Sequence, residues 1–326
     1  MNQRDRLLDV LDRKNVDRVP AASPVQTATY DLMKASGISF PQAHQDPGAM
    51  AALSRAAHTH GLLEGVRVPF ESAVDRGAFQ EANSRLTELT ADIIDRVEIP
   101  DPLVHGRAPV VLKAVAILRE QVRDEVPILV GAAAPFTLAC QLLGEEKAMM
   151  ALVLDPGDLK AVIERAEEWA LRYSSSIIEA GADVVVPLDP TATGDLIGPE
   201  AYRGFALPPQ QRVARSIRDR GGRSIMHICG QTGPNLHLMA MSGMNAINVD
   251  QVMDLREVRR AVGEGMAIVG NVSPVTTLRK GTPEEVLRES LRCIEEGVDV
   301  LCPGCGFSPE TPLENMRALA QAVQRK

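Results

Sequence analysis

The amino-acid sequence predicts an α/β protein folded as a single (β/α)8 TIM barrel with an N-terminal helical extension. Short β-branched runs alternate with longer helical patterns along the whole chain, which is typical of parallel βαβ units. About eight such runs can be counted, and a barrel of eight strands and eight helices takes about 250 residues. The chain has 326 residues, so the excess length is expected in extensions and insertions.

The predicted strands are short and strongly apolar. Val184-Val185-Val186 and Ile268-Val269 are apolar on successive residues, as expected of strands that are buried on both faces. The predicted strands cover residues 19–25, 66–70, 128–133, 183–188, 224–229, 246–250, 267–271 and 299–302.

The predicted helices carry recognisable start and stop signals. An amphipathic helix is expected over residues 3–14, and another over residues 199–220, before two glycines. Thr282 is a predicted N-cap with Pro at the first helical position and Glu285 at the third. Asp155-Pro156 should divide the long helical region between the third and fourth strands into two helices.

The domain organisation is expected to be simple. No linker rich in Gly, Ser or Pro divides the chain and no internal repeat is visible, so residues 1–326 should form one domain, with residues 1–18 as the extension. Residues 80–102 alternate like a hairpin and could absorb the remaining length. A doubly wound open sheet is the alternative, but no Gly-x-Gly-x-x-Gly follows an early strand.

Composition excludes several classes of function. The net charge is −8, with only three Tyr, six Phe and one Trp, which argues against a nucleic-acid partner. No apolar run approaches the roughly 20 residues of a membrane span, and the chain begins with an amphipathic helix instead of a signal peptide. We therefore expect a cytoplasmic protein without a membrane partner; its oligomeric state is not determined by the sequence.

Cysteine and histidine supply the candidate metal site. Five cysteines without a regular framework indicate reduced thiols in a chain that lacks a secretion signal. His227 and Cys229 are two residues apart on a predicted strand, so their side chains point to one face. Cys305 follows the last strand, and two thiolates with one imidazole suit zinc while leaving a fourth position open.

The other polar residues at strand ends are weaker candidates. Barrel active sites lie at the carboxyl ends of the strands, where Asp189, Asp250 and Asn271 also fall. Asp250 is a possible metal ligand or a partner that orients His227, and a structural role in a loop is an equal alternative. The remaining cysteines are expected to pack in the core; they are Cys140, Cys293 and Cys302.

These motifs resemble those of a known family. The chain is similar to the uroporphyrinogen decarboxylase superfamily, specifically to its zinc-dependent branch typified by methylcobalamin:coenzyme M methyltransferase. The shared segments are Asp17-Arg18-Val19-Pro20, Asp189-Pro190 with Ile197-Gly198-Pro199-Glu200-Ala201-Tyr202, His227-Ile228-Cys229-Gly230, Gly270-Asn271-Val272-Ser273-Pro274 and Pro303-Gly304-Cys305-Gly306.

The resemblance implies a function and a set of site residues. It makes His227, Cys229 and Cys305 zinc ligands with Asp250 as a fourth ligand in the resting state, and it implies methyl transfer from a methylated corrinoid to a thiol such as coenzyme M. The corrinoid, methylcobalamin or a related cobamide, would arrive on a partner protein, because no Asp-x-His-x-x-Gly signature occurs here. The last two site residues, expected to line the site beside the substrate or cofactor, are Asp189 and Asn271.

Other reactions remain open at this point. Tetrahydrofolate is an alternative methyl acceptor or donor, and an epoxide is an alternative electrophile. Decarboxylation of a uroporphyrinogen-type tetrapyrrole is less favoured, because Pro69-Phe70-Glu71-Ser72 stands where a decarboxylase has Phe-Ser-Asp. A tetrapyrrole with several propionates also needs clustered cations, and Arg18, Arg67 and Arg76 are scattered in the sequence. A non-catalytic zinc- or corrinoid-binding protein is the last alternative.

Overall fold

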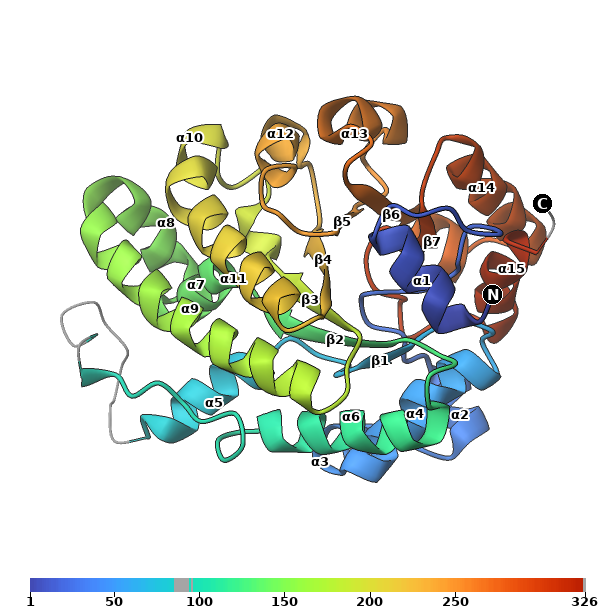
Figure 1. Cartoon of the computed structure of the whole chain (residues 1–326), viewed down its shortest axis with the longest axis horizontal. Coiled ribbons are helices and arrows are strands. Elements are labelled where there is room, and N and C mark those ends of the chain that lie inside the picture. The colour runs from blue at the N-terminus through green and yellow to red at the C-terminus, as the bar shows by residue number, and fades with distance from the viewer. Residues whose placement is uncertain (85–93, 95, 325–326) are drawn as a thin grey trace.

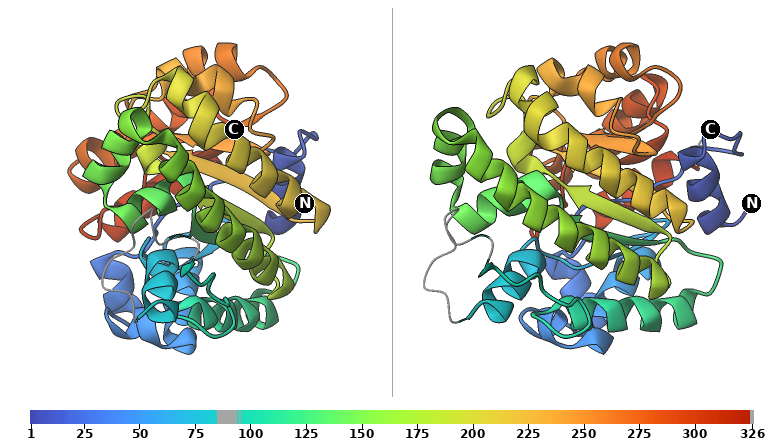
Figure 2. Two further views of the ribbon diagram at one scale, coloured as in Figure 1. Left: turned by 90° about the vertical axis from the view of Figure 1, so that its left-hand side faces the viewer. Right: turned by 60° about the vertical axis from the view of Figure 1, so that its left-hand side comes forward.

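The computed structural model describes residues 1–84, 94 and 96–324. Within them, seven strands form one parallel sheet whose strand order follows the sequence, with helices packed around its outer side (Figures 1 and 2). The strands are β1 (Val66–Val68), β2 (Ile128–Ala133), β3 (Val184–Leu188), β4 (Arg223–Ile228), β5 (Ala246–Val249), β6 (Ala267–Val272) and β7 (Val300–Pro303).

Helices fill the connections between these strands. The α-helices are α1 (Gln3–Leu11), α2 (Tyr30–Ser36), α3 (Gln42–Gln45), α4 (Pro47–Thr59), α5 (Val74–Ala82), α6 (Ala108–Val122), α7 (Pro135–Leu143), α8 (Glu145–Leu154), α9 (Pro156–Glu179), α10 (Pro199–Ala201), α11 (Leu207–Asp219), α12 (Leu236–Met239), α13 (Leu255–Val262), α14 (Pro283–Glu295) and α15 (Leu313–Ala322). Short 3-10 turns η2 (Pro190–Ala192) and η4 (Gly233–Asn235), and π-helical turns η3 (Tyr202–Ala206) and η5 (Pro274–Arg279), complete the connections.

A single bridge joins the two edges of the sheet and confirms the predicted barrel. Ala21 pairs in parallel with Leu301 of β7; Leu301 N donates to Pro20 O at 2.9 Å, and Glu64 N, just before β1, donates to Ala21 O at 2.7 Å. The predicted strand over residues 19–25 is therefore wrong in length. The prolines at its second and sixth positions, Pro20 and Pro24, have no N–H to donate to a ladder.

Alternation along the strands separates two apolar cores. On β3, Val184, Val186 and Leu188 belong to the cluster inside the barrel, whereas Val185 belongs to the cluster between sheet and helices. This is the period of two expected of a strand with both faces buried. The inner cluster is Leu7, Val10, Leu11, Ala22, Leu129, Val184, Val186, Leu188, Ile225, Ala246, Ala267, Val269, Val300 and Cys302.

Helix α1 contributes three members of that inner cluster and closes one end of the barrel. Asn2 caps the helix by accepting a hydrogen bond from Asp5 N at 2.7 Å, and the helix turns Leu7, Val10 and Leu11 toward the barrel interior. Burying a leucine in this way stabilises the fold by about 1.5–3 kcal/mol.

Ion pairs fix α1 and the residues after it to the amino ends of the strands. Each partner in the barrel stands just before a strand or at its first residue, for strands β3, β4 and β7. All of these ion pairs therefore lie at the amino end of the barrel. They are Arg4 with Asp183 at 2.7 Å, Asp12 with Arg223 at 2.6 Å, and Arg13 with Asp299 at 2.7 Å. The amino end of the barrel is thus closed, and the carboxyl ends of the strands are left for a functional site.

The helix predictions agree with the structure in their signals and differ in detail. Thr282 and Glu285 form the predicted capping box, and α8 ends before Asp155 while α9 starts at Pro156. The helix predicted over residues 199–220 contains the π-helical turn η3 between α10 and α11. The hairpin expected over residues 80–102 lies partly outside the described residues; its described part holds the end of α5 and no strand.

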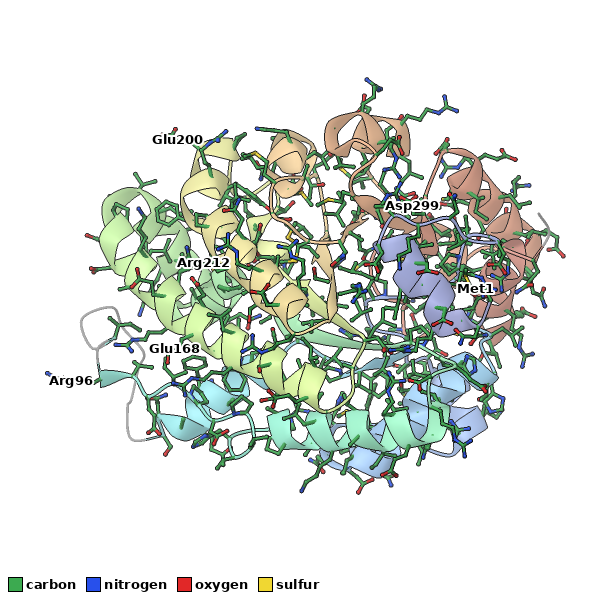
Figure 3. All side chains as sticks on the ribbon, viewed as in Figure 1. Met1, Arg96, Glu168, Glu200, Arg212 and Asp299 are labelled. Carbon is green, nitrogen blue, oxygen red and sulfur yellow. The ribbon has the colours of Figure 1, made fainter. Side chains whose placement is uncertain are left out.

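Polar side chains occupy the outer faces of the helices, as the labelled Glu168, Glu200 and Arg212 show in Figure 3. Arg212 Nη2 donates to Glu167 Oε2 at 2.6 Å and so joins α11 to α9. No helix in the described part of the chain combines the length and apolar character that crossing a bilayer requires.

Candidate metal centre

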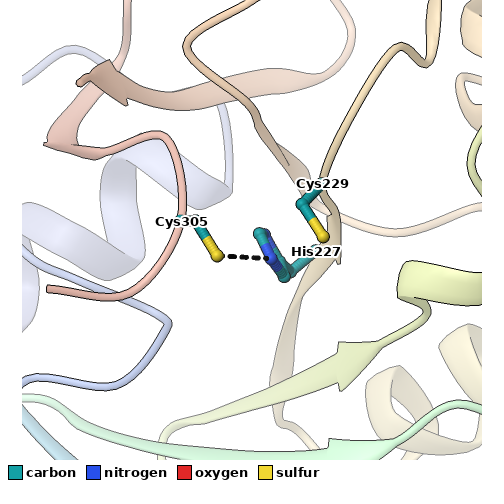
Figure 4. Close-up of side chains that lie close together, drawn as sticks. All are labelled: His227, Cys229 and Cys305. Atoms are coloured by element: carbon teal, nitrogen blue, oxygen red, sulfur yellow. Dashed lines mark hydrogen bonds between the residues drawn. The ribbon is translucent and has the colours of Figure 1, made fainter. Parts of the chain in front are cut away.

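Three of the predicted site residues come together at the carboxyl end of the barrel. His227 lies in β4, Cys229 directly follows that strand, and Cys305 lies in the loop after β7 (Figure 4). The distance from His227 Nε2 to Cys305 Sγ is 3.7 Å. The imidazole nitrogen and both sulfurs lie within 4.8 Å of one another.

Burial differs between the ring and the thiols. His227 is 3% exposed, while Cys229 and Cys305 are half-buried. The cluster is therefore held from the barrel side and is accessible from the sulfur side, as a reactive site needs.

Asn248 of β5 determines which nitrogen of His227 carries the proton. Its Oδ1 lies 2.7 Å from His227 Nδ1, and its Nδ2 donates to Val269 O at 3.0 Å. Because the amide nitrogen is committed to a carbonyl, Oδ1 must be the atom that faces the ring, and His227 Nδ1–H donates to it. The lone pair is then on Nε2, which faces Cys305.

The two thiols influence each other's ionisation. Cys229 donates a hydrogen bond to Cys305, and this contact is the main cause that lowers the pKa of Cys305 to about 4. The same hydrogen bond, together with burial, raises the pKa of Cys229. The pair therefore holds one thiolate readily, and a cation placed between the sulfurs would favour the second.

These donors fit a zinc ion. Zinc binds thiolate sulfur and neutral imidazole nitrogen, commonly with four ligands. His227 presents a lone pair on Nε2, and two sulfurs converge on it from separate loops. The chemistry of this donor set leaves room for one further ligand.

Asp250 lies beside this cluster and holds its loop. Its Oδ2 accepts from Gly230 N at 3.0 Å and its Oδ1 accepts from Val252 N at 3.1 Å. Its charge also contributes to the raised pKa of Cys229. Each carboxylate oxygen accepts one backbone amide and keeps a second lone pair, so direct ligation by Asp250 stays a prediction.

Asn271 also supports this loop. Its Nδ2 donates to Asp250 O at 3.0 Å and to Met253 O at 2.9 Å, and its Oδ1 lies 3.6 Å from the thiol of Cys293. These contacts position the backbone around Asp250. A contact between Asn271 and a substrate or cofactor stays a prediction.

Asp189 is placed differently from the other candidates. It is fully buried, and its carboxylate accepts from Thr137 Oγ1 at 2.7 Å and Gln210 Nε2 at 2.7 Å, on α7 and α11. Burial raises its pKa to about 6. The side chain thus binds the outer helices to the carboxyl end of β3, and a contact between Asp189 and a substrate or cofactor stays a prediction.

The remaining cysteines are buried, as predicted. Cys140, Cys293 and Cys302 have no exposed surface, and burial raises the pKa of each thiol. They are therefore unsuited to act as nucleophiles at neutral pH.

Two polar residues of the barrel interior were missed by the sequence reasoning. Asn248 and Arg67 each stand between apolar residues in a short strand, as in Ile247-Asn248-Val249 and Val66-Arg67-Val68. A polar residue in an otherwise buried strand is unusual. A polar residue between apolar residues of a strand, at a position expected to face the barrel interior, is the sequence signal that could have identified both residues.

Comparison with known proteins identifies the family of this chain. The family model described as Uroporphyrinogen decarboxylase (URO-D) matches residues 2–326. The methylcobamide:CoM methyltransferase MtbA of Methanosarcina acetivorans is 33% identical over 98% of this chain and 97% of its own length. MtaA of Methanosarcina barkeri, which carries the same enzyme name, is 34% identical over 97% of this chain and 96% of its own.

A solved structure shares the fold of this chain. A methyltransferase from Methanosarcina mazei superposes with a TM-score of 0.93 and 34% identity, covering 99% of this chain and 98% of its own. The family match and these full-length relatives confirm the resemblance inferred from the motifs: the chain belongs to the uroporphyrinogen decarboxylase family, where its relatives include the methylcobamide:CoM methyltransferases.

Proposed function

We propose that this protein is a zinc-dependent methyltransferase that moves a methyl group from a methylated corrinoid to a thiol such as coenzyme M. The single observation that carries the proposal is the convergence of His227 Nε2 with the sulfurs of Cys229 and Cys305 within 4.8 Å. The relatives named methylcobamide:CoM methyltransferase support the reaction class.

The roles of the residues follow from their contacts. His227, Cys229 and Cys305 hold the zinc ion, with the tautomer of His227 fixed by Asn248. A bound zinc ion supplies Lewis acidity, which keeps an acceptor thiol in its thiolate form at neutral pH. Asp250 holds Gly230 N and thereby the position of Cys229.

Two anionic ligands suit this chemistry better than neutral ones. A free thiol has a pKa of about 8.5 and is mostly protonated at pH 7. The two cysteine thiolates cancel the double charge of the ion, so the acceptor sulfur keeps much of its electron density. Three neutral imidazoles would hold the sulfur more tightly and reduce its reactivity toward a methyl group.

The methyl donor is proposed to arrive on a partner protein. The sequence contains no Asp-x-His-x-x-Gly motif for holding a corrinoid. The half-buried sulfurs at the open end of the barrel would meet a corrinoid presented from outside. We further propose that residues 1–326 act as one domain, because the closing bridge pairs Ala21 with Leu301, near opposite ends of the chain.

The decisive experiment is a methylcobalamin demethylation assay combined with metal analysis. The purified protein should contain about one zinc per chain and should demethylate methylcobalamin with coenzyme M, and a chelator should abolish the reaction. Tetrahydrofolate, assayed as an alternative acceptor, should not replace the thiol.

Two substitutions complete this test. Cys229→Ser should lose zinc and methyl transfer together, whereas Cys140→Ala, which changes a cysteine buried away from the cluster, should keep both. Full methyl transfer by a protein without bound metal would show that the proposal is wrong.

A further inference from the structure

Arg67 carries a charge inside the barrel. It is the middle residue of β1, and its neighbours Val66 and Val68 both pack in the cluster between sheet and helices. Alternation along a strand therefore turns Arg67 to the inner face. The residue is only 2% exposed.

The guanidinium extends toward the open end of the barrel. Arg67 pairs with Leu129 in the register of β1 and β2, but its Nη2 lies over Gly131, two residues further along β2. A Cβ atom at Gly131 would overlap Nη2, and it would also lie 3.4 Å from Leu188 Cδ1 on the inner face of β3. Gly131 thus leaves the space that the guanidinium occupies, on the way to the carboxyl ends of the strands.

The charge of Arg67 has no acidic partner within the described part of the chain. Its Nε donates to Pro24 O at 3.1 Å, and its Nη1 is buried without any hydrogen-bond partner. Burial lowers the pKa of Arg67 to about 10, and attraction to Cys305 is among the effects that oppose this. Leu188, which lies beside Gly131, pairs with His227 in the register of β3 and β4, so the guanidinium lies near the strands that carry the proposed zinc ligands.

Another buried arginine shows the usual arrangement. Arg6 is 5% exposed and is paired with two carboxylates, at 2.6 Å from Asp17 and 3.4 Å from Glu64. A guanidinium buried without such a partner is costly. A purely structural role gives no reason for Arg67 to remain unpaired.

We propose that Arg67 is the residue that binds the anionic end of the methyl acceptor and so selects an anionic thiol over a neutral one. The inference rests on the proposed function and assigns the part of the site that selects the acceptor. The free N–H groups of Arg67 would donate to the oxygens of the anion, which a guanidinium matches in geometry. The sulfur would then reach the zinc ligands.

Acceptor discrimination tests this assignment. Coenzyme M and 2-mercaptoethanol have the same thiol and spacer and differ in the anionic group. In Arg67→Met, kcat/KM for coenzyme M should fall about 100-fold, as expected for the loss of charge-assisted hydrogen bonds. The value for 2-mercaptoethanol should change less than threefold. An equal loss with both thiols would overturn the proposal.

Two further variants separate charge from folding. Gly131→Ala keeps Arg67 but displaces its guanidinium, so it should also weaken coenzyme M selectively. Arg76→Met, on the exposed side of α5, should behave as wild type with both acceptors. Because Arg67→Met removes an unpaired buried charge, its Tm should equal or exceed that of wild type; a lower Tm with unchanged acceptor preference would identify a structural role.

A binding measurement separates this proposal from the proposed reaction. Ethanesulfonate has the anion and no thiol, so its binding needs neither methyl transfer nor a corrinoid. Calorimetric titration should show binding to the wild-type protein and at least tenfold weaker binding to Arg67→Met. If no thiol is methylated yet ethanesulfonate binding depends on Arg67, the reaction is wrong and the anion site stands. Equal binding by both proteins would remove the anion site.

Discussion

Asn248 Oδ1 lies 2.7 Å from Nδ1 of His227 and thereby directs Nε2 of the ring toward Cys305. The amide of Asn248 is itself fixed, since Nδ2 donates to Val269 O at 3.0 Å and lies 3.4 Å from Cys302 Sγ. One side chain on β5 therefore links β4, β6 and β7 at the level of the proposed zinc site. The orientation of the imidazole is therefore supported by side chains of the barrel interior.

Replacing this asparagine should weaken metal binding while the three ligands remain. In Asn248→Leu, His227 loses the acceptor that fixes its tautomer, and we expect zinc affinity to fall about 10–100-fold. Competition with a chromophoric chelator measures the change. Asn315→Leu is a matched control, because Asn315 is equally buried and does not contact His227. Its Nδ2 donates to two backbone carbonyls, Leu278 O and Gly281 O. Equal losses in both variants would mean that general destabilisation, not ring orientation, is responsible.

Asp250→Asn distinguishes a ligand from a residue that positions a loop. Asp250 accepts from Gly230 N and Val252 N, so we expect the substitution to lower zinc affinity less than tenfold, equally with and without coenzyme M. The reason is that a loosened loop affects Cys229 in both states. Zinc affinity is measured by chelator competition at saturating and at zero thiol. A loss confined to the thiol-free state would instead identify Asp250 as the fourth ligand that the acceptor displaces.

The buried carboxyl group of Asp75 should make stability depend on pH. Burial raises its pKa to about 6, above the value of about 3.9 in an unfolded chain. The folded state therefore binds the proton more tightly, and the resulting stabilisation is complete below about pH 4 and is lost as pH rises through 6. Relative to Asp75→Asn, the wild-type free energy of unfolding should fall by up to about 3 kcal/mol over this range.

Urea unfolding at several pH values, with a chelator present, measures this difference. Trp169 is the only tryptophan in the sequence, and its Nε1 donates to Asp75 Oδ1 at 2.8 Å, so its fluorescence reports on the same contact. Asp254→Asn is a control for which the opposite dependence of stability on pH is expected. Backbone N–H groups lower the pKa of Asp254, so its contribution to stability is lost as pH falls. A difference between wild type and Asp75→Asn that does not vary with pH would contradict the prediction.

Most strands could be predicted because their apolar runs are local signals. β2 was predicted with its observed bounds and β3 to within one residue. The first predicted strand is reduced to a bridge at Ala21, because β-branched composition does not take into account that Pro20 and Pro24 have no N–H to donate to a ladder. Strand propensity thus located the strands along the chain. Whether a predicted strand pairs over its full length depended on the backbone N–H groups that its residues can donate.

The candidate site was predictable in part for a related reason. His227 and Cys229 are close in sequence, and barrel topology brings Cys305 to the same end, so their convergence follows from the fold. The roles of Asn248 and Arg67 depend on which side chains of other strands lie next to them in the barrel. A single sequence does not show directly which side chains these are. The same holds for Asp189, whose position at a strand end gave no indication that its side chain turns outward to Thr137.

Removing a side chain that closes the barrel should destabilise the fold without changing the site. Leu11 of α1 is 1% exposed and packs in the barrel interior, so Leu11→Ala should lower the free energy of unfolding by about 2–5 kcal/mol. Leu8→Ala, at a partly buried position on the same helix, should lower it less. Both variants should keep wild-type zinc content in the native state, because α1 lies at the amino ends of the strands and the metal cluster at the carboxyl ends. Urea unfolding and metal analysis measure the two quantities separately, and loss of zinc from folded Leu11→Ala would show that the two ends of the barrel are coupled.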